Sequence, residues 1–244
     1  IFANSNLIKE MDEKVLEQVI NVACLPGIQK ASMAMSDAHW GYGFCIGGVA
    51  AFSPEDGVLS VGGVGFDGGC GVRTLKTDLK LKDIKPKIKQ VVDKIFEEVP
   101  AGLGNRGEIL VQGDEINNLL TKGAKWAVEK GYGNENDLEY IEDNGCVTGA
   151  DPKKVSDIAI KREKKQIGTL GSGNHYLEIQ YVSEIYDENA AKVFGLEKDQ
   201  ILISIHCGSR ALGHQIGTDY LKVLAEASRK YNIPIKDREL VCAP

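Results

Sequence analysis

The sequence has few of the residues that stiffen or cross-link a chain, with 7 prolines and 6 cysteines in 244 residues. The cysteines stand singly and form no C-x-x-C pair, so the common zinc-ribbon and thioredoxin-like motifs are excluded. A chain of this length can bury a sizeable apolar core without disulfide bonds. We therefore expect reduced thiols and a cytoplasmic location.

Long apolar runs are also missing from the sequence. No stretch approaches the roughly 20 residues of a membrane-spanning helix, and no signal-peptide core is present, so we expect no membrane partner. The chain begins at Ile1 rather than at Met and stops at the apolar segment 241–244. We expect the natural protein to extend beyond both ends.

The sequence also has no excess of positive charge, since its formal net charge is −6. This balance argues against a dedicated nucleic-acid coat protein, although it leaves room for a local basic groove. One basic run lies within 153–165. Taken alone, that run is typical of a solvated helix face.

Glycine, by contrast, is abundant, with 28 residues gathered in short clusters. Clustered glycines without a repeat exclude collagen and flexible linkers. They indicate loops in which the backbone adopts positive φ or approaches another group closely.

Hydrophobic periodicity predicts both helices and strands, without regular alternation between them. Helices are predicted over 10–24, 83–98, 115–130 and 213–231, and another opens at 151–152; strands are predicted over 31–35, 48–52, 58–61, 72–75, 176–182 and 200–206. Asp83 is expected to cap its helix, and the strand at 72–75 to continue the sheet of the earlier strands. The pattern favours an α+β fold of mixed sheets with flanking helices, in one domain over 1–244.

The densest glycine cluster, at 62–73, contains two residues that can bind a metal. Asp67 and Cys70 lie three apart on a loop with little side-chain bulk. A literal G-x-G-x-x-G in the same loop runs into a strand rather than a helix, so the dinucleotide fingerprint is not met. His175 and His206 lie at the ends of two predicted strands. Together with these histidines, the loop offers oxygen, sulfur and nitrogen donors. That set suits Zn²⁺ or Mn²⁺; the alternative is that Asp67 caps a turn and Cys70 is simply buried.

Two further glycine turns, at 168–173 and 208–210, offer backbone N–H groups that can cradle phosphate, with Arg210 as a forked cation. A metal beside phosphate-binding turns points to phosphoryl chemistry.

Taken together, the motifs resemble those of the RtcB-type RNA-splicing ligases. The matching segments are Ser36–Gly48 (SDAHWGYGFCIGG), Gly62–Arg73 (GGVGFDGGCGVR), Gly168–Glu178 (GTLGSGNHYLE) and His206–Gln215 (HCGSRALGHQ), with lesser matches at Leu25–Gln29, Gly123–Val128 and Asp237–Pro244. They occur in the family's order and span nearly the whole chain.

The resemblance implies an RtcB-like fold and a GTP- and manganese-dependent ligase. Such an enzyme joins an RNA 2′,3′-cyclic phosphate or 3′-phosphate end to a 5′-hydroxyl end in tRNA splicing and RNA repair, through a guanylated histidine. RNA is the implied substrate, and an archease-type activator is a possible partner. The guanylated histidine and one further metal ligand belong to the family's C-terminal portion, so this chain alone is expected to be inactive.

The resemblance also assigns roles to single residues. Asp67, Cys70, His175 and His206 are the implied ligands of two Mn²⁺ ions, with Cys70 bridging them. The nucleotide is expected to contact Asn174 through its phosphates and Glu178 through its guanine. Arg210 is expected to contact RNA phosphates, and Asp37 and His39 to lie near the reacting ends.

The sequence departs from the family pattern at Gly68 and Gly69, where a bulkier apolar residue and Asn are usual. Two other hypotheses stay open from the residues alone. One is a two-metal phosphoesterase that trims RNA phosphate ends, and the other is a non-catalytic module.

Overall fold

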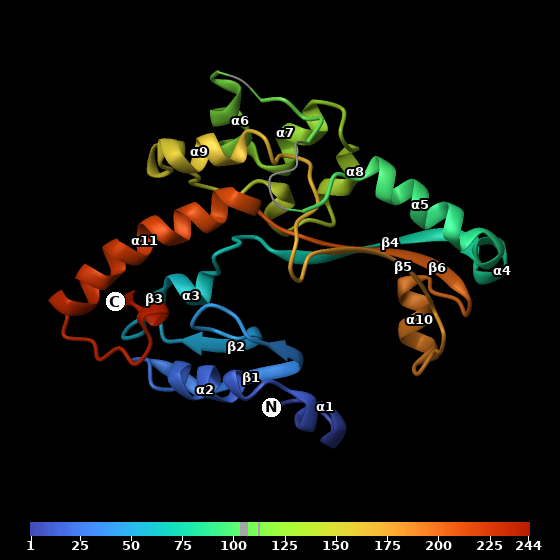
Figure 1. Ribbon diagram of the computed structural model, residues 1–244. Helices are drawn as coiled ribbons and strands as arrows, with labels where there is room; N and C mark the ends of the chain where they lie inside the picture. The colour runs from blue at the N-terminus through green and yellow to red at the C-terminus, as the bar shows by residue number, and fades with distance from the viewer. Residues whose placement is uncertain (103–106, 112) are drawn as a thin grey trace. The chain divides into compact units, whose positions relative to one another are not determined.

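The computed structural model describes residues 1–102, 107–111 and 113–244. Within it the chain forms two compact units, one of residues 1–69 and 212–244 and one of residues 70–211. Both units combine helices with small antiparallel sheets (Figure 1), which confirms the α+β expectation. An isolated bridge between Ala101 and Leu170 is parallel. No helix in the described part of the chain is both long and apolar enough to cross a bilayer.

The first unit is built around a two-stranded sheet and a two-stranded ribbon. Its elements are α1 (Ser5–Glu10), α2 (Glu13–Val22), β1 (Ile28–His39), β2 (Ile46–Phe52), β3 (Leu59–Ser60), α3 (Val61–Val64), η4 (Arg238–Leu240), β7 (Cys242–Ala243) and α11 (Arg210–Lys230) from residue 212 onward. β1 pairs with β2 and β3 pairs with β7, both antiparallel.

Packing in the first unit depends on two buried valines of α2, Val15 and Val22. Val15 is fully buried with Ala34 of β1, and Val22 is buried with Leu240 and Cys242. The helix starts after Asp12, whose side chain accepts a hydrogen bond from the N–H of Lys14 at 2.8 Å. This cap separates α1 from α2 and shortens the helix predicted over 10–24.

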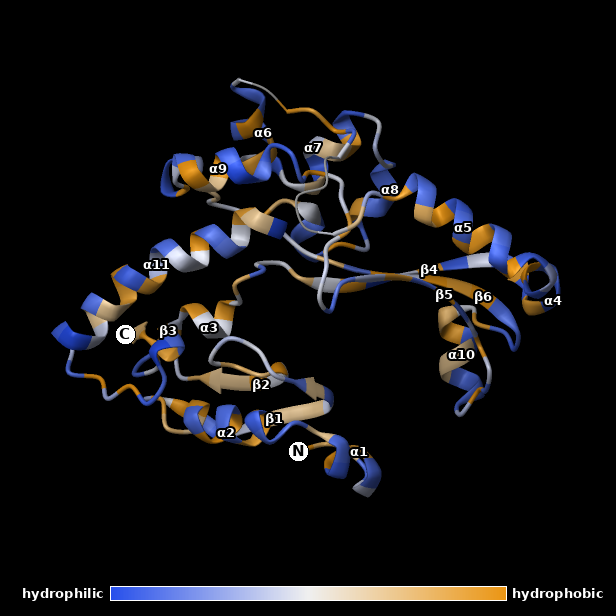
Figure 2. Ribbon diagram, viewed as in Figure 1, coloured by the Kyte–Doolittle hydropathy of each residue, from blue (hydrophilic) through white to orange (hydrophobic). Residues whose placement is uncertain are grey.

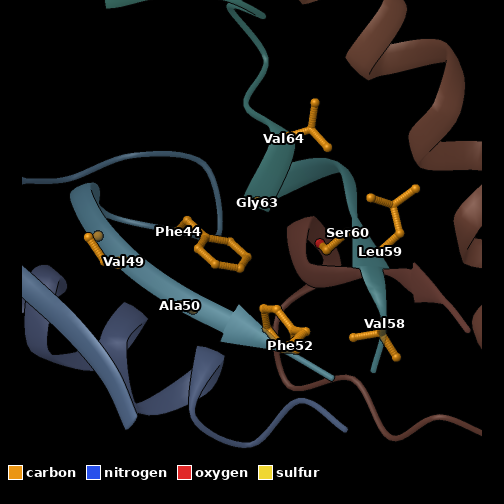
Figure 3. A pocket seen from close by; sticks show the side chains of 10 residues that line it. Phe44, Val49, Ala50, Phe52, Val58, Leu59, Ser60, Gly63 and Val64 are labelled. Atoms are coloured by element: carbon orange, nitrogen blue, oxygen red, sulfur yellow. The ribbon is translucent and has the colours of Figure 1, made fainter. Parts of the chain in front are cut away.

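An open pocket of about 390 Å³ lies in the first unit, between β2 and β3 (Figure 3). Its lining side chains are apolar apart from the Ser60 hydroxyl, and the lining residues are Phe44, Gly48, Val49, Ala50, Phe52, Val58, Leu59, Ser60, Gly63 and Val64. Because none of these side chains titrates or binds metal well, the pocket offers no catalytic group of its own.

The second unit holds a three-stranded antiparallel sheet in the order β4-β6-β5. Its elements are β4 (Gly71–Lys80), α4 (Leu81–Ile84), η1 (Lys85–Lys87), α5 (Ile88–Glu98), α6 (Glu115–Lys122), α7 (Ala124–Glu129), α8 (Glu135–Leu138), η2 (Glu142–Gly145), η3 (Pro152–Lys154), α9 (Asp157–Glu163), β5 (Tyr176–Tyr181), α10 (Glu188–Phe194) and β6 (Gln200–Cys207). A separate helical core gathers around Val111, Ile116 and Trp126. Figure 2 shows apolar residues along the middle of the sheet.

Two helix predictions are wrong in detail for reasons of backbone geometry. The segment 83–98 is divided into α4, η1 and α5, and Asp83 lies inside the first turn, where its carboxylate accepts from the N–H of Lys80 at 2.9 Å. The segment 115–130 is broken at Gly123, whose φ of +56° ends α6 before α7 begins. A positive φ of this kind is tolerated by glycine and interrupts a right-handed helix.

Two strand predictions also need correction. Within the segment 58–61, Leu59 and Ser60 form the strand β3, whereas Val61 begins the short helix α3. The strand at 72–75 is real, yet it belongs to the β4-β6-β5 sheet rather than to that of the earlier strands. Its partners lie about 130 residues later in the sequence, and periodicity carries no information about pairing over that distance.

Candidate metal centre

The central strand β6 positions the first of the candidate ligands, His206. Residues of β6 pair with β4 on one side and with β5 on the other, so its backbone is hydrogen-bonded along both edges. His206 lies opposite Val72 of β4 and Tyr176 of β5. This double pairing fixes the position of His206 in the sheet.

The same register brings Cys70 and His175 to that end of β6. Cys70 precedes β4, whose first residue, Gly71, pairs with Cys207. His175 precedes β5, whose first residue, Tyr176, pairs with His206. The beginnings of β4 and β5 therefore lie beside the end of β6, since both pair with it in antiparallel register. This pairing brings Cys70 close to two histidines that follow it by more than 100 positions.

The three ligand atoms lie within reach of one ion. The Cys70 Sγ is 3.1 Å from the Nε2 of His206 and 3.3 Å from the Nε2 of His175. All three atoms lie within 4.8 Å of one another. Bonds from a divalent ion to sulfur and nitrogen measure about 2.3 and 2.1 Å, so an ion can contact both members of each pair. One thiolate and two imidazoles are donors that a transition metal accepts.

A glycine makes room for the ring of His175. A Cβ placed on Gly171 would lie 1.7 Å from the Nδ1 of His175, which is far inside van der Waals contact. Residue 171 must therefore lack a side chain while the ring holds this position. Sequence reasoning noted the glycine turn at 168–173 but did not identify this steric role.

Other residues of the sheet surround the three ligands. The ring of Tyr176 stands edge-on to that of His206, with centroids 5.4 Å apart. Asn174 directly precedes His175 and is exposed. Glu178 pairs with Ser204, two positions from His206, so its side chain shares the face of the sheet that His206 occupies. Its carboxylate accepts a hydrogen bond from the Gln180 side chain at 2.8 Å.

Arg210 stands at the start of α11 with a positive φ of 57°. Its Nε donates to the Oγ1 of Thr169 at 3.3 Å, and one terminal nitrogen donates to the carbonyl of Gly102 at 2.9 Å. A guanidinium carries five N–H donors, so these two bonds to described residues leave three for another acceptor.

Cys70, His175 and His206 are called the metal-ligand group below. The remaining predicted site residues lie in the first unit, and none of them belongs to this group. Asp67 is half-buried on the loop before Cys70. Asp37 and His39 end β1, where the Nδ1 of His39 is 2.9 Å from the carbonyl oxygen of Asp37. The roles expected for these three residues stay predictions.

One of the two glycines at which the sequence departs from the family pattern, Gly69, has a left-handed backbone conformation. Gly69 has a φ of +72°, and a Cβ added there would meet nothing within 4 Å. Glycine and asparagine adopt this backbone conformation more readily than other residues. Glycine therefore suits the positive φ that the backbone has at position 69.

The other histidine lies near two aromatic rings, and two of the cysteines are buried. His214 lies in α11 beside Phe66 and Tyr42, with ring centroids 5.8 and 6.2 Å apart. Burial raises the pKa of Cys45 and of Cys242, because a thiolate is poorly solvated in an apolar core. These two thiols therefore stay protonated at neutral pH.

Comparison with known proteins shows which family the chain resembles along its length. The family described as tRNA-splicing ligase RtcB matches residues 18–244. The tRNA-splicing ligase RtcB of Methanococcus maripaludis is 55% identical over all of this chain and 51% of its own length. That of Thermococcus kodakarensis is 50% identical over all of the chain and 51% of its own length. The RNA-splicing ligase RtcB of Mycobacterium tuberculosis is 49% identical over 93% of the chain and 53% of its own length.

The chain thus spans about half the length of the curated relatives it matches. The match nevertheless covers both compact units and every residue of the metal-ligand group. By this extent of similarity the chain belongs to the tRNA-splicing ligase RtcB family.

Proposed function

We propose that the full-length protein is an RNA ligase that joins a 2′,3′-cyclic phosphate or 3′-phosphate end to a 5′-hydroxyl end, in tRNA splicing and RNA repair. The observation that carries the proposal is the convergence of Cys70, His175 and His206 at one end of the β4-β6-β5 sheet. Relatives named RtcB ligases, about 50% identical to the chain, support the reaction class.

The metal in this proposal is Mn²⁺, and Cys70, His175, His206 and Asp67 are the residues that would hold two such ions. When bound, such ions neutralise charge on the phosphates and favour the deprotonated thiol. The chain's own contribution is to hold a sulfur and two imidazole nitrogens together without steric conflict, which Gly171 permits. Metal binding by these residues requires Cys70 as a thiolate and both imidazoles neutral.

The nucleotide in this proposal is GTP. Asn174 is assigned to its phosphates and Glu178 to its guanine, and the shared face of Glu178 and His206 supports a nucleotide lying along the sheet. Arg210 is assigned to RNA phosphates through the guanidinium N–H groups that its bonds to Thr169 and Gly102 leave unused. Asp37 and His39 are assigned to the reacting ends.

The histidine that accepts GMP is placed in the part of the relatives that this chain does not span. The 244 residues alone should therefore bind Mn²⁺ weakly and form no covalent GMP adduct. A cytoplasmic location, a single catalytic domain and an archease-type activator complete the proposal.

The test is a ligation assay on the full-length protein with Mn²⁺ and GTP. One RNA strand carries a 2′,3′-cyclic phosphate and a labelled 5′ end, and the other carries a 5′-hydroxyl. The expected product is a sealed strand that forms only when GTP is present, and Cys70→Ala should abolish it. Trimmed phosphate ends without joining would instead indicate a two-metal phosphoesterase. Absence of both products, together with no bound metal under any condition, would indicate a non-catalytic module.

A further inference from the structure

The two histidine ligands belong to segments that are linked by one buried residue, Thr169. His206 ends β6, and the chain then runs through Cys207 to Arg210. His175 ends a loop that begins near Thr169. Thr169 is 4% exposed, and it contacts both the segment after His206 and the loop before His175.

The hydroxyl of Thr169 has a donor and an acceptor role, and both are filled. It donates to the carbonyl of Gln166 at 2.7 Å and accepts from the Nε of Arg210 at 3.3 Å. The carbonyl of Thr169 faces the Sγ of Cys207 at 3.5 Å. Buried polar groups are costly when unpaired, and removing this hydroxyl would take away the acceptor of the Arg210 Nε.

The same two segments are joined at further points. The Gln166 side chain accepts from the N–H of Ala211 at 3.3 Å. Arg210 also donates to Gly102, whose own N–H donates to the carbonyl of Gly171 at 3.0 Å. Gly171 is the residue that must stay clear of the His175 ring. The network therefore runs from the end of the His206 strand to the glycine that sets the position of His175.

Arg210 is the partner of Thr169 in this contact between the two segments, and its backbone is strained. Its φ of 57° is unfavourable for a residue with a side chain, and such conformations persist where surrounding contacts impose them. The bonds of Arg210 to Thr169 and Gly102 are such contacts.

We propose that Thr169 is a positioning residue for the metal centre, holding the His175 loop against the end of the His206 strand through Arg210. It is not one of the three candidate ligands, and it acts by fixing the distance between the two imidazoles. Loss of a group that orients metal ligands costs about 10- to 100-fold in metal affinity. The inference rests on the proposed metal centre, and its test separates the two.

The experiment uses the full 244-residue chain and Co²⁺ as the probe, because a Co²⁺–thiolate pair absorbs light and reports ligand geometry. Thr169→Val removes the hydroxyl at nearly constant shape, and Thr169→Ser retains it. Thr169→Val should weaken Co²⁺ binding by about tenfold or more and alter the visible ligand-field bands, whereas Thr169→Ser should stay near the parent. Thermal unfolding followed by circular dichroism checks that each variant is folded.

A second variant, Arg210→Met, covers the case in which Thr169→Val does not fold. If Thr169 acts through Arg210, each single change should weaken Co²⁺ binding, and the double change should cost little more than either alone. RNA binding plays no part in this readout, so an RNA-contact role of Arg210 does not affect it.

The outcomes are distinguishable. If the parent chain binds Co²⁺ and Cys70→Ala binds it with the same affinity and spectrum, the metal centre itself is wrong. If the parent binds Co²⁺ and folded Thr169→Val matches it in affinity and spectrum, the positioning role is overturned. Fully additive losses for Thr169→Val and Arg210→Met would also overturn the link between these residues.

Discussion

The two units of the chain are stabilised in different ways. The first unit contains two buried clusters, centred on Val15 and on Leu240, with a helix packed on a two-stranded sheet. The second unit has one buried cluster, formed by its helices, and no residue of β4, β5 or β6 belongs to any of the three clusters in the described chain. The sheet that carries the candidate ligands therefore owes its geometry to backbone pairing more than to side-chain packing. A metal site placed on such a sheet can stay accessible without weakening a core.

Because the first unit depends on buried side chains, the largest effect on the free energy of unfolding is expected from a substitution in its core. Leu240 is 1% exposed, so Leu240→Ala should lower the free energy of unfolding by about 2–5 kcal/mol while Co²⁺ affinity is retained in the folded protein. Leu59, which is 62% exposed, supplies the control, because Leu59→Ala should change the unfolding free energy by about 0.5 kcal/mol or less. Urea unfolding measures both. Equal effects of the two variants would contradict the comparison.

The complementary change is Cys70→Ala in the second unit. It should lower Co²⁺ affinity by at least about 100-fold, or about 2.8 kcal/mol, and leave urea unfolding of the metal-free chain nearly unchanged, since Cys70 is exposed. Cys24→Ala is the matched control, because Cys24 is also exposed but lies in the first unit. Isothermal titration of Co²⁺ gives the affinities. A Cys70→Ala chain that bound Co²⁺ like the parent would remove the thiol from the site.

Two glycine substitutions in one loop should have smaller effects, one through a steric clash and the other through backbone strain. Gly171→Ala places a Cβ against the Nδ1 of His175, so Co²⁺ affinity should fall by about tenfold. Gly173→Ala meets no atom within 4 Å but has a φ of +73°, so it should cost about 1 kcal/mol in stability and little in affinity. Titration and urea unfolding of both variants check this. The reverse ranking of affinities would show that His175 is not held where the structure places it.

The smallest expected effect is a pH dependence in the first unit. Burial raises the pKa of Cys45 above its ordinary value of 9.0, so the unfolded chain releases this proton first as the pH rises. The stabilisation is complete below pH 9.0 and is lost as the pH rises through the higher pKa of the folded state. Cys45→Ala should flatten the decline of the unfolding free energy between pH 8.5 and about 10, whereas the exposed Cys24→Ala should not. Parallel slopes for parent and Cys45→Ala would refute this account.

Local elements could be predicted from the sequence wherever side-chain period and secondary structure agree. The alternation of Leu177, Ile179 and Tyr181 predicts β5, and the apolar run before His206 predicts β6; both strands are confirmed. Breaks set by backbone dihedrals were missed, as at Gly123, because glycine permits a positive φ without requiring it.

The candidate site was predictable to a different degree. Residue type and glycine context singled out Cys70, His175 and His206, and the structure brings these three together. Their convergence depends on the antiparallel register of β4 and β5 against β6, which no local pattern encodes. Thr169 was missed because its role comes from what it contacts across the fold, and a threonine in a glycine turn carries no such signal.

The central place of β6 has a consequence for the order in which the site comes apart. Amides of a strand paired on both edges open to solvent exchange later than those of loops and strand ends. His206 lies on that strand, whereas His175 lies on the loop before an edge strand. Spontaneous local opening should therefore release an imidazole from position 175 while the one at 206 stays in place. Loss of a bound ion would then begin at the loop, and its dissociation rate would follow the opening rate of that loop rather than of the whole unit.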